Sequence, residues 1–348
     1  MIPPEPCTRD LASWSWASVN AITPTATTLC CCRAAMSLKF PDHMECAVSM
    51  SDATTKSASA TSIENKADPI RGHARVVSNE EEGPGRRLRL AVPDWPGSIP
   101  GQFVMIGAGA EAGVPRRDPL LPRPMAIYRE LGSSGVRASA EGEIELLYRV
   151  VGRGTQLLSE AREGESIKVV GPLGRGFPLD RPAVASVDES GSKAILVGGG
   201  TGIASLYELA RALISRGRSV VVILGGRSAG DLMGQREFEA LDVQLICTTE
   251  DGSDGVHGLV TTPLADGLTS GERGATVYAV GPTPMMKACA ALAATNSVDC
   301  YVSLENPMAC GFGVCLGCAA PRAEGGFFLV CRAGPVFLAR EIDWEGLP

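Results

Sequence analysis

Short apolar runs, broken by glycine and proline, mark the first patterned region of this 348-residue chain. Between residues 72 and 182 they occur at 87–92, 102–106, 143–151 and 166–170. Short strands at regular spacing, with turn residues between them, are typical of a small antiparallel barrel. We therefore expect an antiparallel β-barrel over residues 69–184, followed by a polar linker at 186–192.

After the linker, the pattern changes to strands that alternate with helices. An apolar strand at 193–197 precedes a glycine-rich turn and a helix that runs to Leu213. Further apolar strands follow at 219–224, 243–247 and 276–280. This alternation predicts a parallel α/β domain over residues 192–298. A small cysteine-rich module over residues 299–344 closes the chain, so the expected fold class is mixed β and α/β.

Residues 1–68 differ from the rest of the chain, because they are rich in Ser, Thr and Ala and have no lasting hydrophobic period. They lack the basic start and continuous apolar core of a signal peptide. We expect a disordered extension here. A true start at Met36, Met44 or Met50 would explain the same pattern.

Composition narrows the classes of function. A net charge of −7 and a pI of about 5.2 argue against a nucleic-acid partner. No apolar run reaches the ~18 residues that a membrane-spanning helix needs. Twelve cysteines without a secretion signal favour a reducing compartment, so we expect a cytoplasmic protein. Only three histidines are present, and no Ser-His-Asp set or pair of carboxylates stands out. We therefore expect no catalytic side chain and assign the chemistry to cofactors.

Four cysteines near the C-terminus carry the strongest chemical signal. Their spacing, C-x4-C-x2-C-x12-C, is the plant-type spacing of a [2Fe–2S] cluster, with the candidate ligands Cys310, Cys315, Cys318 and Cys331. Glycines between the first three allow a tight loop whose amides approach the bridging sulfides. Structural zinc is one alternative, although zinc sites usually pair two short knuckles. A disulfide framework is the other, although it suits small secreted domains. A cluster stores one electron, so the sequence predicts electron transfer.

The glycine-rich turn after the first α/β strand predicts a phosphate cradle. Glycines let a pyrophosphate approach the backbone, and free amides at the helix start attract it. The candidate residues are Gly199, Gly200, Thr201 and Gly202. Close packing of strand on helix would also favour glycine, and the strict G-x-G-x-x-G spacing is absent.

Acidic residues after the third α/β strand predict the choice of nicotinamide cofactor. Glu250 or Asp251 beside an adenosine ribose would accept hydrogen bonds from its hydroxyls and repel a 2′-phosphate. We therefore expect NADH to be preferred over NADPH. A solvated turn is the alternative, and Arg227 nearby would favour a phosphate instead.

Two segments of the expected barrel, 118–128 and 147–156, also have features of an anion site. Arg123 and Arg149 are suited to pair with phosphate oxygens. Glycine amides and the Thr155 hydroxyl would suit a second phosphate. Ordinary arginines on a barrel rim and an ordinary helix cap at Thr155 explain these residues equally well.

Taken together, these motifs resemble the electron-transfer subunits of two-subunit dihydroorotate dehydrogenases, within the ferredoxin reductase superfamily. The likeness covers residues 70–343 and rests chiefly on two segments, Met308–Cys318 and Val330–Phe337. The resemblance implies that FAD binds to the barrel, through Arg123, Pro124, Met125, Ala126, Leu147, Tyr148, Arg149, Gly154 and Thr155. One position departs from the family, because Ala126 stands where a serine hydroxyl usually meets the flavin.

The resemblance also implies a route for electrons and a partner. NADH exchanges a hydride and a [2Fe–2S] cluster exchanges single electrons, so a flavin must lie between them. The implied route is dihydroorotate, FMN in a TIM-barrel catalytic subunit, the cluster, FAD and then NAD⁺, as part of pyrimidine biosynthesis. We expect a heterotetramer in which this chain contacts the catalytic subunit through the apolar residues near 312–316 and 335–338. The alternatives are a reductase subunit of the ferredoxin:NADP or sulfhydrogenase type and, from another class, a zinc-stapled binding module.

Overall fold

The computed structural model describes residues 68–111, 118–132, 141–179, 192–269 and 275–347. The predicted extension at 1–68 lies outside these residues except for Asp68, and the predicted linker lies outside them except for Ser192. No helix in the described part of the chain is long and apolar enough to cross a membrane.

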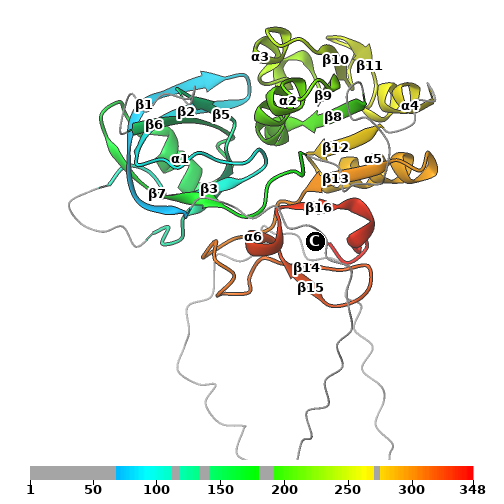
Figure 1. Ribbon diagram of the computed structural model, residues 1–348. Helices are drawn as coiled ribbons and strands as arrows, with labels where there is room; N and C mark the ends of the chain where they lie inside the picture. The colour runs from blue at the N-terminus through cyan, green and yellow to red at the C-terminus, as the bar shows by residue number, and fades with distance from the viewer. Residues whose placement is uncertain (1–67, 112–117, 133–140, 180–191, 270–274, 348) are drawn as a thin grey trace, which may run out of the picture. The chain divides into compact units, whose positions relative to one another are not determined.

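The first part of the fold is a seven-stranded sheet in the order β4-β3-β7-β1-β2-β6-β5. Every recorded pairing in it is antiparallel, and the sheet is strongly curled (Figure 1). One short helix, α1 (Arg153–Ser159), follows β6. The strands are β1 (Ile70–Glu82), β2 (Gly85–Pro93), β3 (Phe103–Ile106), β4 (Arg123–Ala126), β5 (Arg129–Leu131), β6 (Glu141–Tyr148) and β7 (Ser166–Leu173).

The apolar runs of the sequence became these strands because their alternate side chains fill one core. Val76, Leu88, Leu90, Ile144 and Leu146 are wholly buried, and they point to the same interior from three neighbouring strands. Period-two alternation on a curled antiparallel sheet produces this arrangement. The structure therefore confirms the expected antiparallel β fold, in the form of a curled sheet.

The second part is a sheet in the order β11-β10-β9-β8-β12-β13-β16, parallel except for β16. Its strands are β8 (Lys193–Gly199), β9 (Ser219–Gly226), β10 (Gln244–Thr249), β11 (Val256–His257), β12 (Thr276–Val280), β13 (Asp299–Ser303) and β16 (Val336–Leu338). Helices α2 (Tyr207–Ile214), α3 (Gln235–Glu239), α4 (Thr261–Thr269) and α5 (Thr283–Thr295) connect them. The expected helix after the glycine-rich turn begins as a 3₁₀ helix at Gly200–Ser205 and continues as α2.

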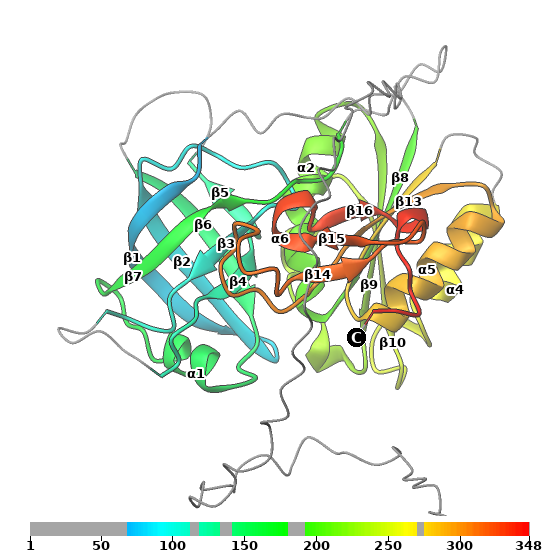
Figure 2. The same cartoon turned by 90° about the horizontal axis from the view of Figure 1, so that it is seen from below.

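The cysteine module continues from the edge of this parallel sheet. β13, which begins at the boundary predicted at residue 299, pairs with β12, and β16 adds to β13 as an antiparallel edge strand. Between these two strands lie the cysteine loop, the hairpin of β14 (Ala319–Pro321) and β15 (Phe327–Leu329), and α6 (Val330–Ala333). Figure 2 shows this hairpin and α6 alongside the β13–β16 edge. A 3₁₀ helix at Ala339–Glu341 follows β16.

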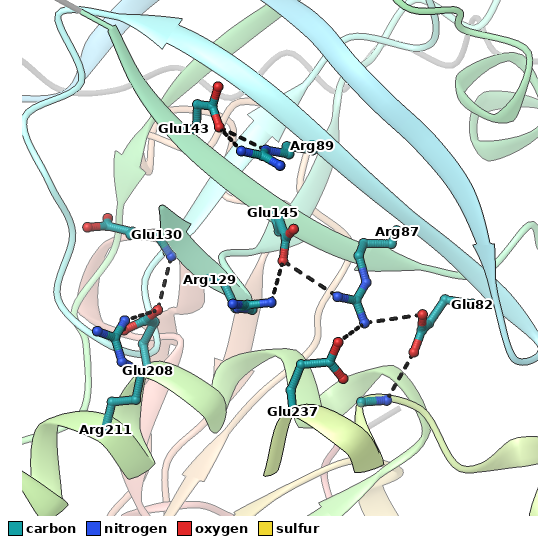
Figure 3. A network of polar contacts seen from close by, with 11 residues as sticks. Glu82, Arg87, Arg89, Arg129, Glu130, Glu143, Glu145, Glu208, Arg211 and Glu237 are labelled. Atoms are coloured by element: carbon teal, nitrogen blue, oxygen red, sulfur yellow. Dashed lines mark hydrogen bonds and ion pairs between the residues drawn. The ribbon is translucent and has the colours of Figure 1, made fainter. Parts of the chain in front are cut away.

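A network of charged side chains links the two sheets (Figure 3). Arg87 on β2 forms ion pairs with Glu237 on α3, at 2.5 Å, and with Glu82 on β1, at 3.1 Å. Glu82 in turn accepts a hydrogen bond from the backbone N–H of Gly234, at 3.4 Å. The side chains of Arg87 and Glu237 are only 16% and 17% exposed, so solvent screens their attraction weakly. The network therefore fixes the antiparallel sheet against the α3 segment of the parallel one.

Candidate functional site

The four predicted cluster ligands lie together in the cysteine module. The Sγ atoms of Cys318 and Cys331 are 3.2 Å apart, and both residues are buried. Cys310 and Cys315 form a second thiol pair through a side-chain hydrogen bond, and Cys315 is exposed. Among the described residues, no three potential ligands form a site for a single metal ion. Two linked pairs of thiols suit a centre with two irons better than a mononuclear zinc site.

Cys310 and Cys331, one thiol from each pair, have pKa values that are shifted in opposite directions. For Cys310, burial opposes ionisation, but hydrogen bonds from Cys315, Phe312 and Val314 outweigh it and lower the thiol pKa to about 6. For Cys331, burial and the neighbouring Cys318 thiol raise the pKa to about 12. A bound cation would offset the cost of ionising the buried Cys331 thiol, because a coordinated thiol loses its proton outright.

Left-handed backbone at three positions makes the cysteine loop tight. Gly311 and Gly313 have φ values of 77° and 80°, and Leu316 has a φ of 60°. A Cβ on Gly311 would lie 2.8 Å from the side chain of Met105 on β3, so the loop packs directly against the antiparallel sheet. The glycines predicted for amide access to a cluster therefore also allow this close approach.

A cavity of about 460 Å³ lies between residues of the two sheets; we call it the inter-sheet cavity. Eight residues predicted from the sequence line it, namely Arg123, Pro124, Met125, Ala126, Leu147, Tyr148, Arg149 and Thr155. The ninth predicted barrel residue, Gly154, does not line it but touches Arg123, because a Cβ there would lie within 2.5 Å of the guanidinium. Arg123 is also held by its own donation to the carbonyl of Leu121, at 2.7 Å.

The Thr155 hydroxyl already has local partners. Its oxygen accepts hydrogen bonds from the N–H groups of Val151, at 3.0 Å, and Gly152, at 3.2 Å, and it donates to the Gly152 carbonyl. The hydroxyl therefore caps the start of α1, which was one of the two interpretations open from the sequence. Thr155 also lines the inter-sheet cavity, which is compatible with a further hydrogen bond between its hydroxyl and a ligand.

A second cavity, of about 430 Å³, opens at the carboxyl ends of β8, β9 and β10; we call it the strand-end cavity. Gly199, Gly200 and Glu250 line it, as the sequence predicts for a dinucleotide site. This position is where open α/β sheets bind nucleotides. Arg149 lines both cavities, so the two adjoin at its side chain.

Two residues of the predicted phosphate cradle lie elsewhere. Thr201 lines the inter-sheet cavity rather than the strand-end cavity. Gly202 lines neither, because a Cβ there would lie 2.6 Å from the Val280 carbonyl. The glycine at 202 thus serves close packing of the 3₁₀ helix on β12, the alternative that the sequence left open.

The two acidic residues proposed to face a ribose, both in the turn after β10, differ in position. Glu250 lines the strand-end cavity, whereas Asp251 does not. Asp251 accepts hydrogen bonds from the hydroxyl and N–H of Ser253, at 2.6 and 3.0 Å, and these bonds lower its pKa. Arg227, the residue that would favour a phosphate, is 3.6 Å from Asp231 and forms an ion pair with it.

Three polar cavity residues at the carboxyl end of β13 were missed by the sequence analysis. Ser303, Glu305 and Asn306 come from the carboxyl end of β13 and line the inter-sheet cavity. They belong to no glycine or cysteine motif. The rule that ligands bind beyond the carboxyl ends of parallel strands would have pointed to them, had β13 been assigned to the sheet.

Apolar side chains around the cysteines form an exposed patch, which we call the cluster-loop patch. Phe312, Val314, Leu316 and Phe327 are 49%, 82%, 62% and 72% exposed. A Cβ on Gly313, at the centre of this loop, would approach Leu329 on β15, so the loop and the hairpin that carries Phe327 are neighbours. An exposed apolar surface of this kind is typical of interaction sites.

Comparison with known proteins gives the same picture. A family model of the "iron-sulfur cluster binding domain of dihydroorotate dehydrogenase B" matches residues 305–343, and one of an "oxidoreductase NAD-binding domain" matches residues 196–291. The electron transfer subunit of dihydroorotate dehydrogenase B (NAD⁺) from Geobacillus sp. (strain WCH70) is 40% identical over 247 residues, covering 70% of this chain and 87% of the relative. The corresponding subunit of Desulforamulus reducens is 35% identical and covers 71% and 88%.

Solved structures share the fold. An NADH-dependent reduced ferredoxin-NADP oxidoreductase aligns with a TM-score of 0.63 and 31% identity, over 78% of this chain and 90% of that chain. A ferredoxin reductase of carbazole 1,9a-dioxygenase, at 21% identity and a TM-score of 0.53, shares the fold over 67% of this chain and 68% of its own. With four thiols in two pairs, two adjoining cavities and relatives at this level of identity, the chain belongs to the family of dihydroorotate dehydrogenase B electron transfer subunits.

Proposed function

We propose that this chain passes electrons from a dihydroorotate dehydrogenase catalytic subunit, through a [2Fe–2S] cluster and FAD, to NAD⁺. The observation that carries the proposal is the contiguity of the three sites. The segment between β13 and Cys310 lines the inter-sheet cavity at Asn306 and Met308, and that cavity meets the strand-end cavity at Arg149. The cluster, the flavin and the nicotinamide would thus lie next to one another, in the order in which the electrons pass.

The residues of the inter-sheet cavity fit FAD. Arg123 and Arg149 offer guanidinium groups for the pyrophosphate, and the close approach of Gly154 fixes Arg123 in place. Leu147, Tyr148 and the β4 backbone would line the ring system. When bound, the flavin supplies the exchange between single electrons and a hydride. The protein binds it, orients it and keeps water from it.

The thiols fit a [2Fe–2S] cluster with Cys310 and Cys315 on one iron and Cys318 and Cys331 on the other. The Cys318–Cys331 separation of 3.2 Å and the hydrogen-bonded Cys310–Cys315 pair support this division. The buried pair would face the protein, and the exposed Cys315 would place the other iron toward the surface. A cluster near the surface can accept electrons from another protein.

The strand-end cavity is the proposed NAD site. Gly199 and Gly200 would admit the pyrophosphate, and Glu250 would accept hydrogen bonds from the adenosine ribose. The ion pair between Arg227 and Asp231 leaves Arg227 partly neutralised, which weakens its attraction for a 2′-phosphate. These features support a preference for NADH over NADPH.

The cluster-loop patch is the proposed docking surface for the FMN-containing catalytic subunit. Three of its four exposed apolar side chains lie within three residues of the exposed Cys315, so covering them would also bring a partner to the cluster. We also propose that two catalytic and two electron-transfer chains assemble into a heterotetramer. We also propose a cytoplasmic location, which the free thiols of Cys247, Cys289 and Cys300 support.

A second candidate function is that of a reductase subunit serving a ferredoxin. The 31% identity to an NADH-dependent reduced ferredoxin-NADP oxidoreductase favours it. The two candidates share every cofactor and differ in the partner at the cluster-loop patch. The partner therefore decides between them.

Co-expression with a dihydroorotate dehydrogenase catalytic subunit tests the proposal. We expect a stable complex that contains FMN, FAD and iron, and that reduces NAD⁺ with dihydroorotate. The isolated chain should oxidise NADH with artificial acceptors but should not oxidise dihydroorotate. A chain that binds zinc without flavin, or that reduces NAD(P)⁺ only with reduced ferredoxin, would contradict it.

A further inference from the structure

The segment that joins β9 to α3 carries wall residues of the strand-end cavity and contacts the antiparallel part of the fold. Asp231 lines this cavity and lies 3.8 Å from Arg149, which lines both cavities. Three residues further on, the backbone N–H of Gly234 donates a hydrogen bond to Glu82 on β1, at 3.4 Å. Part of the wall of the proposed NAD site therefore depends on contacts with the antiparallel part of the fold.

Arg87 lies at the centre of these contacts (Figure 3). From β2 it forms ion pairs with Glu237 on α3, at 2.5 Å, and with Glu82, at 3.1 Å. Because Glu82 also accepts the bond from Gly234, one guanidinium holds both ends of the segment 234–237. Burial opposes the charge of Arg87, but the hydrogen bond from Arg87 to Glu237 and the charges of Glu237 and Glu82 outweigh it and raise the guanidinium pKa. Arg87 is therefore a permanent cation at this junction.

A second contact between the sheets involves helix α2. Glu208 accepts a hydrogen bond from the backbone N–H of Glu130 on β5, at 3.0 Å, as Figure 3 shows. Arg129 lies over the ring of Tyr207, 5.1 Å from its centroid. Helix α2 continues the 3₁₀ helix that begins at Gly200, a wall residue of the strand-end cavity. Contacts at two helices restrict rotation of one sheet against the other more than a single contact would.

Stability alone explains this charged network poorly. The attraction within a buried ion pair often does no more than offset the cost of desolvating both charges. Within the described part of the chain, three buried polar atoms here lack a hydrogen-bond partner, namely Arg87 Nε, Glu145 Oε2 and the hydroxyl of the adjoining Tyr128. Glu145 Oε2 has ion pairs only, the nearer with Arg129 at 3.4 Å. Such unpaired atoms cost free energy that apolar side chains would not. The network is therefore better suited to align the two sheets than to stabilise them.

Hydride transfer requires the two reacting atoms to be about 3–3.5 Å apart. The residues proposed for FAD come from the antiparallel part of the fold and those proposed for NAD from the parallel sheet, so contacts between the sheets set this separation. Resting on the proposed function, we propose that Arg87 is a positioning residue, which holds the NAD site against the FAD site in the orientation that hydride transfer needs. Arg87 lines neither cavity and acts through Glu82 and Glu237. The hydride moves directly between nicotinamide and flavin, and no bond to Arg87 forms or breaks.

Stopped-flow reduction of the FAD- and cluster-loaded chain tests this role. At saturating NADH, we expect Arg87→Met to slow flavin reduction about tenfold or more, because a small misplacement of reacting groups has an effect of this size. The Kd for NADH and the rate of flavin reduction by reduced methyl viologen should stay at wild-type values, since neither needs the two sites to be aligned.

Arg89→Met is the matched control, because Arg89 also lies on β2 but forms its ion pair with Glu143 of the same sheet. The control should behave as wild type in both reactions. An unchanged NADH rate in Arg87→Met, equal slowing with both reagents, or a loss of NADH affinity that accounts for the slowing would overturn the inference.

Hydrogen exchange of the oxidised, cofactor-loaded chain gives a readout that is independent of activity. Arg87→Met should speed exchange at Gly234 and through α3, while the amides of β8 and β12 stay protected. Unchanged exchange in α3 would show that Arg87 does not hold this segment and would overturn the inference. If Arg87→Met does not fold, Glu237→Gln removes the charge of the partner at nearly the same size, and the same pattern is expected. A wild-type chain that binds no FAD, or whose flavin NADH does not reduce, would instead contradict the proposed function and this inference with it.

Discussion

Two apolar segments flank Cys318 and Cys331, and they differ in exposure. Phe312, Val314 and Leu316 precede the buried thiols and are 49–82% exposed, whereas Val336 and Phe337 follow them and are 8% and 5% exposed. Both segments were expected to face a partner from the sequence. For 335–338 that expectation is wrong, because the segment forms β16, an edge strand of the parallel sheet.

The difference comes from the available neighbours rather than from hydrophobicity. β16 pairs with β13, and Phe337 packs on Phe328 with ring centroids 4.4 Å apart. The cysteine loop instead alternates apolar residues with glycines in left-handed conformation, so its side chains have no sheet to enter. One apolar segment therefore stabilises the fold, and the other remains free for a partner.

The largest effect should come from the ligand within the exposed segment. Changing Cys315→Ala removes one thiolate of the Cys310–Cys315 pair, and a two-iron centre needs four thiolates, of which only three would remain. We expect complete loss of the cluster with FAD retained, since FAD would bind in the separate inter-sheet cavity. Iron content and absorbance after purification measure both. Cys247→Ala is the control, and a full cluster signal in Cys315→Ala would refute the ligand assignment.

A charge in the buried segment should unfold its surroundings. Phe337→Asp removes a buried ring and leaves a carboxylate among apolar side chains, at a cost of at least about 3–5 kcal/mol. We expect lower yield and a lower thermal midpoint even for the isolated chain. Phe327→Asp, on an exposed ring, should leave the midpoint unchanged. Equal stability of the two variants would contradict the contrast between the segments.

A charge in the exposed segment should affect only the complex. Phe312→Asp places a carboxylate at the centre of the proposed interface, and loss of an aromatic hot spot costs about 2 kcal/mol or more, which is roughly 30-fold in Kd. NADH oxidation with a dye should remain at the wild-type rate. Leu120→Asp, a 76% exposed residue of the antiparallel part, is the matched control. Wild-type co-purification of Phe312→Asp would place the interface elsewhere.

The smallest effect should appear in the strand-end cavity, away from both segments. Replacing Glu250 with Gln keeps its size but removes the charge that would repel a 2′-phosphate. We expect the preference for NADH over NADPH to fall about tenfold, as one interaction of ~1.4 kcal/mol would give. Asp251→Gln, which changes a residue outside the cavity, should have no such effect. The ratio of kcat/KM values decides, and better turnover of wild type with NADPH would contradict the assignment.

Regular elements were predictable from the sequence where pattern and burial agree. The apolar run at 276–280 has the same bounds as β12. The runs that became β2, β7, β8 and β9 lie inside longer strands. β4 was not predicted as a strand, because the prolines before and within it hide its alternation. It exists as an edge strand, where proline is tolerated.

The site was predictable where a motif is local and not where it depends on topology. Cysteine spacing alone predicted that the four thiols group together, because three of them come from one loop. The place of Thr201 and the packing role of Gly202 depend on how the 3₁₀ helix meets β12, which the turn sequence does not encode. Glu305 belongs to no motif, and only its position beyond β13 brings it to the cavity.

One measurement tests the central claim most directly, namely anaerobic titration of the purified chain with NADH, followed by absorbance and electron paramagnetic resonance. The account predicts that NADH bleaches the flavin and produces the signal of a reduced [2Fe–2S] cluster in the same protein. Adding the catalytic subunit and orotate should then reoxidise both centres. A flavin that is reduced while the cluster stays oxidised, or centres that remain reduced after orotate and the partner are added, would contradict it.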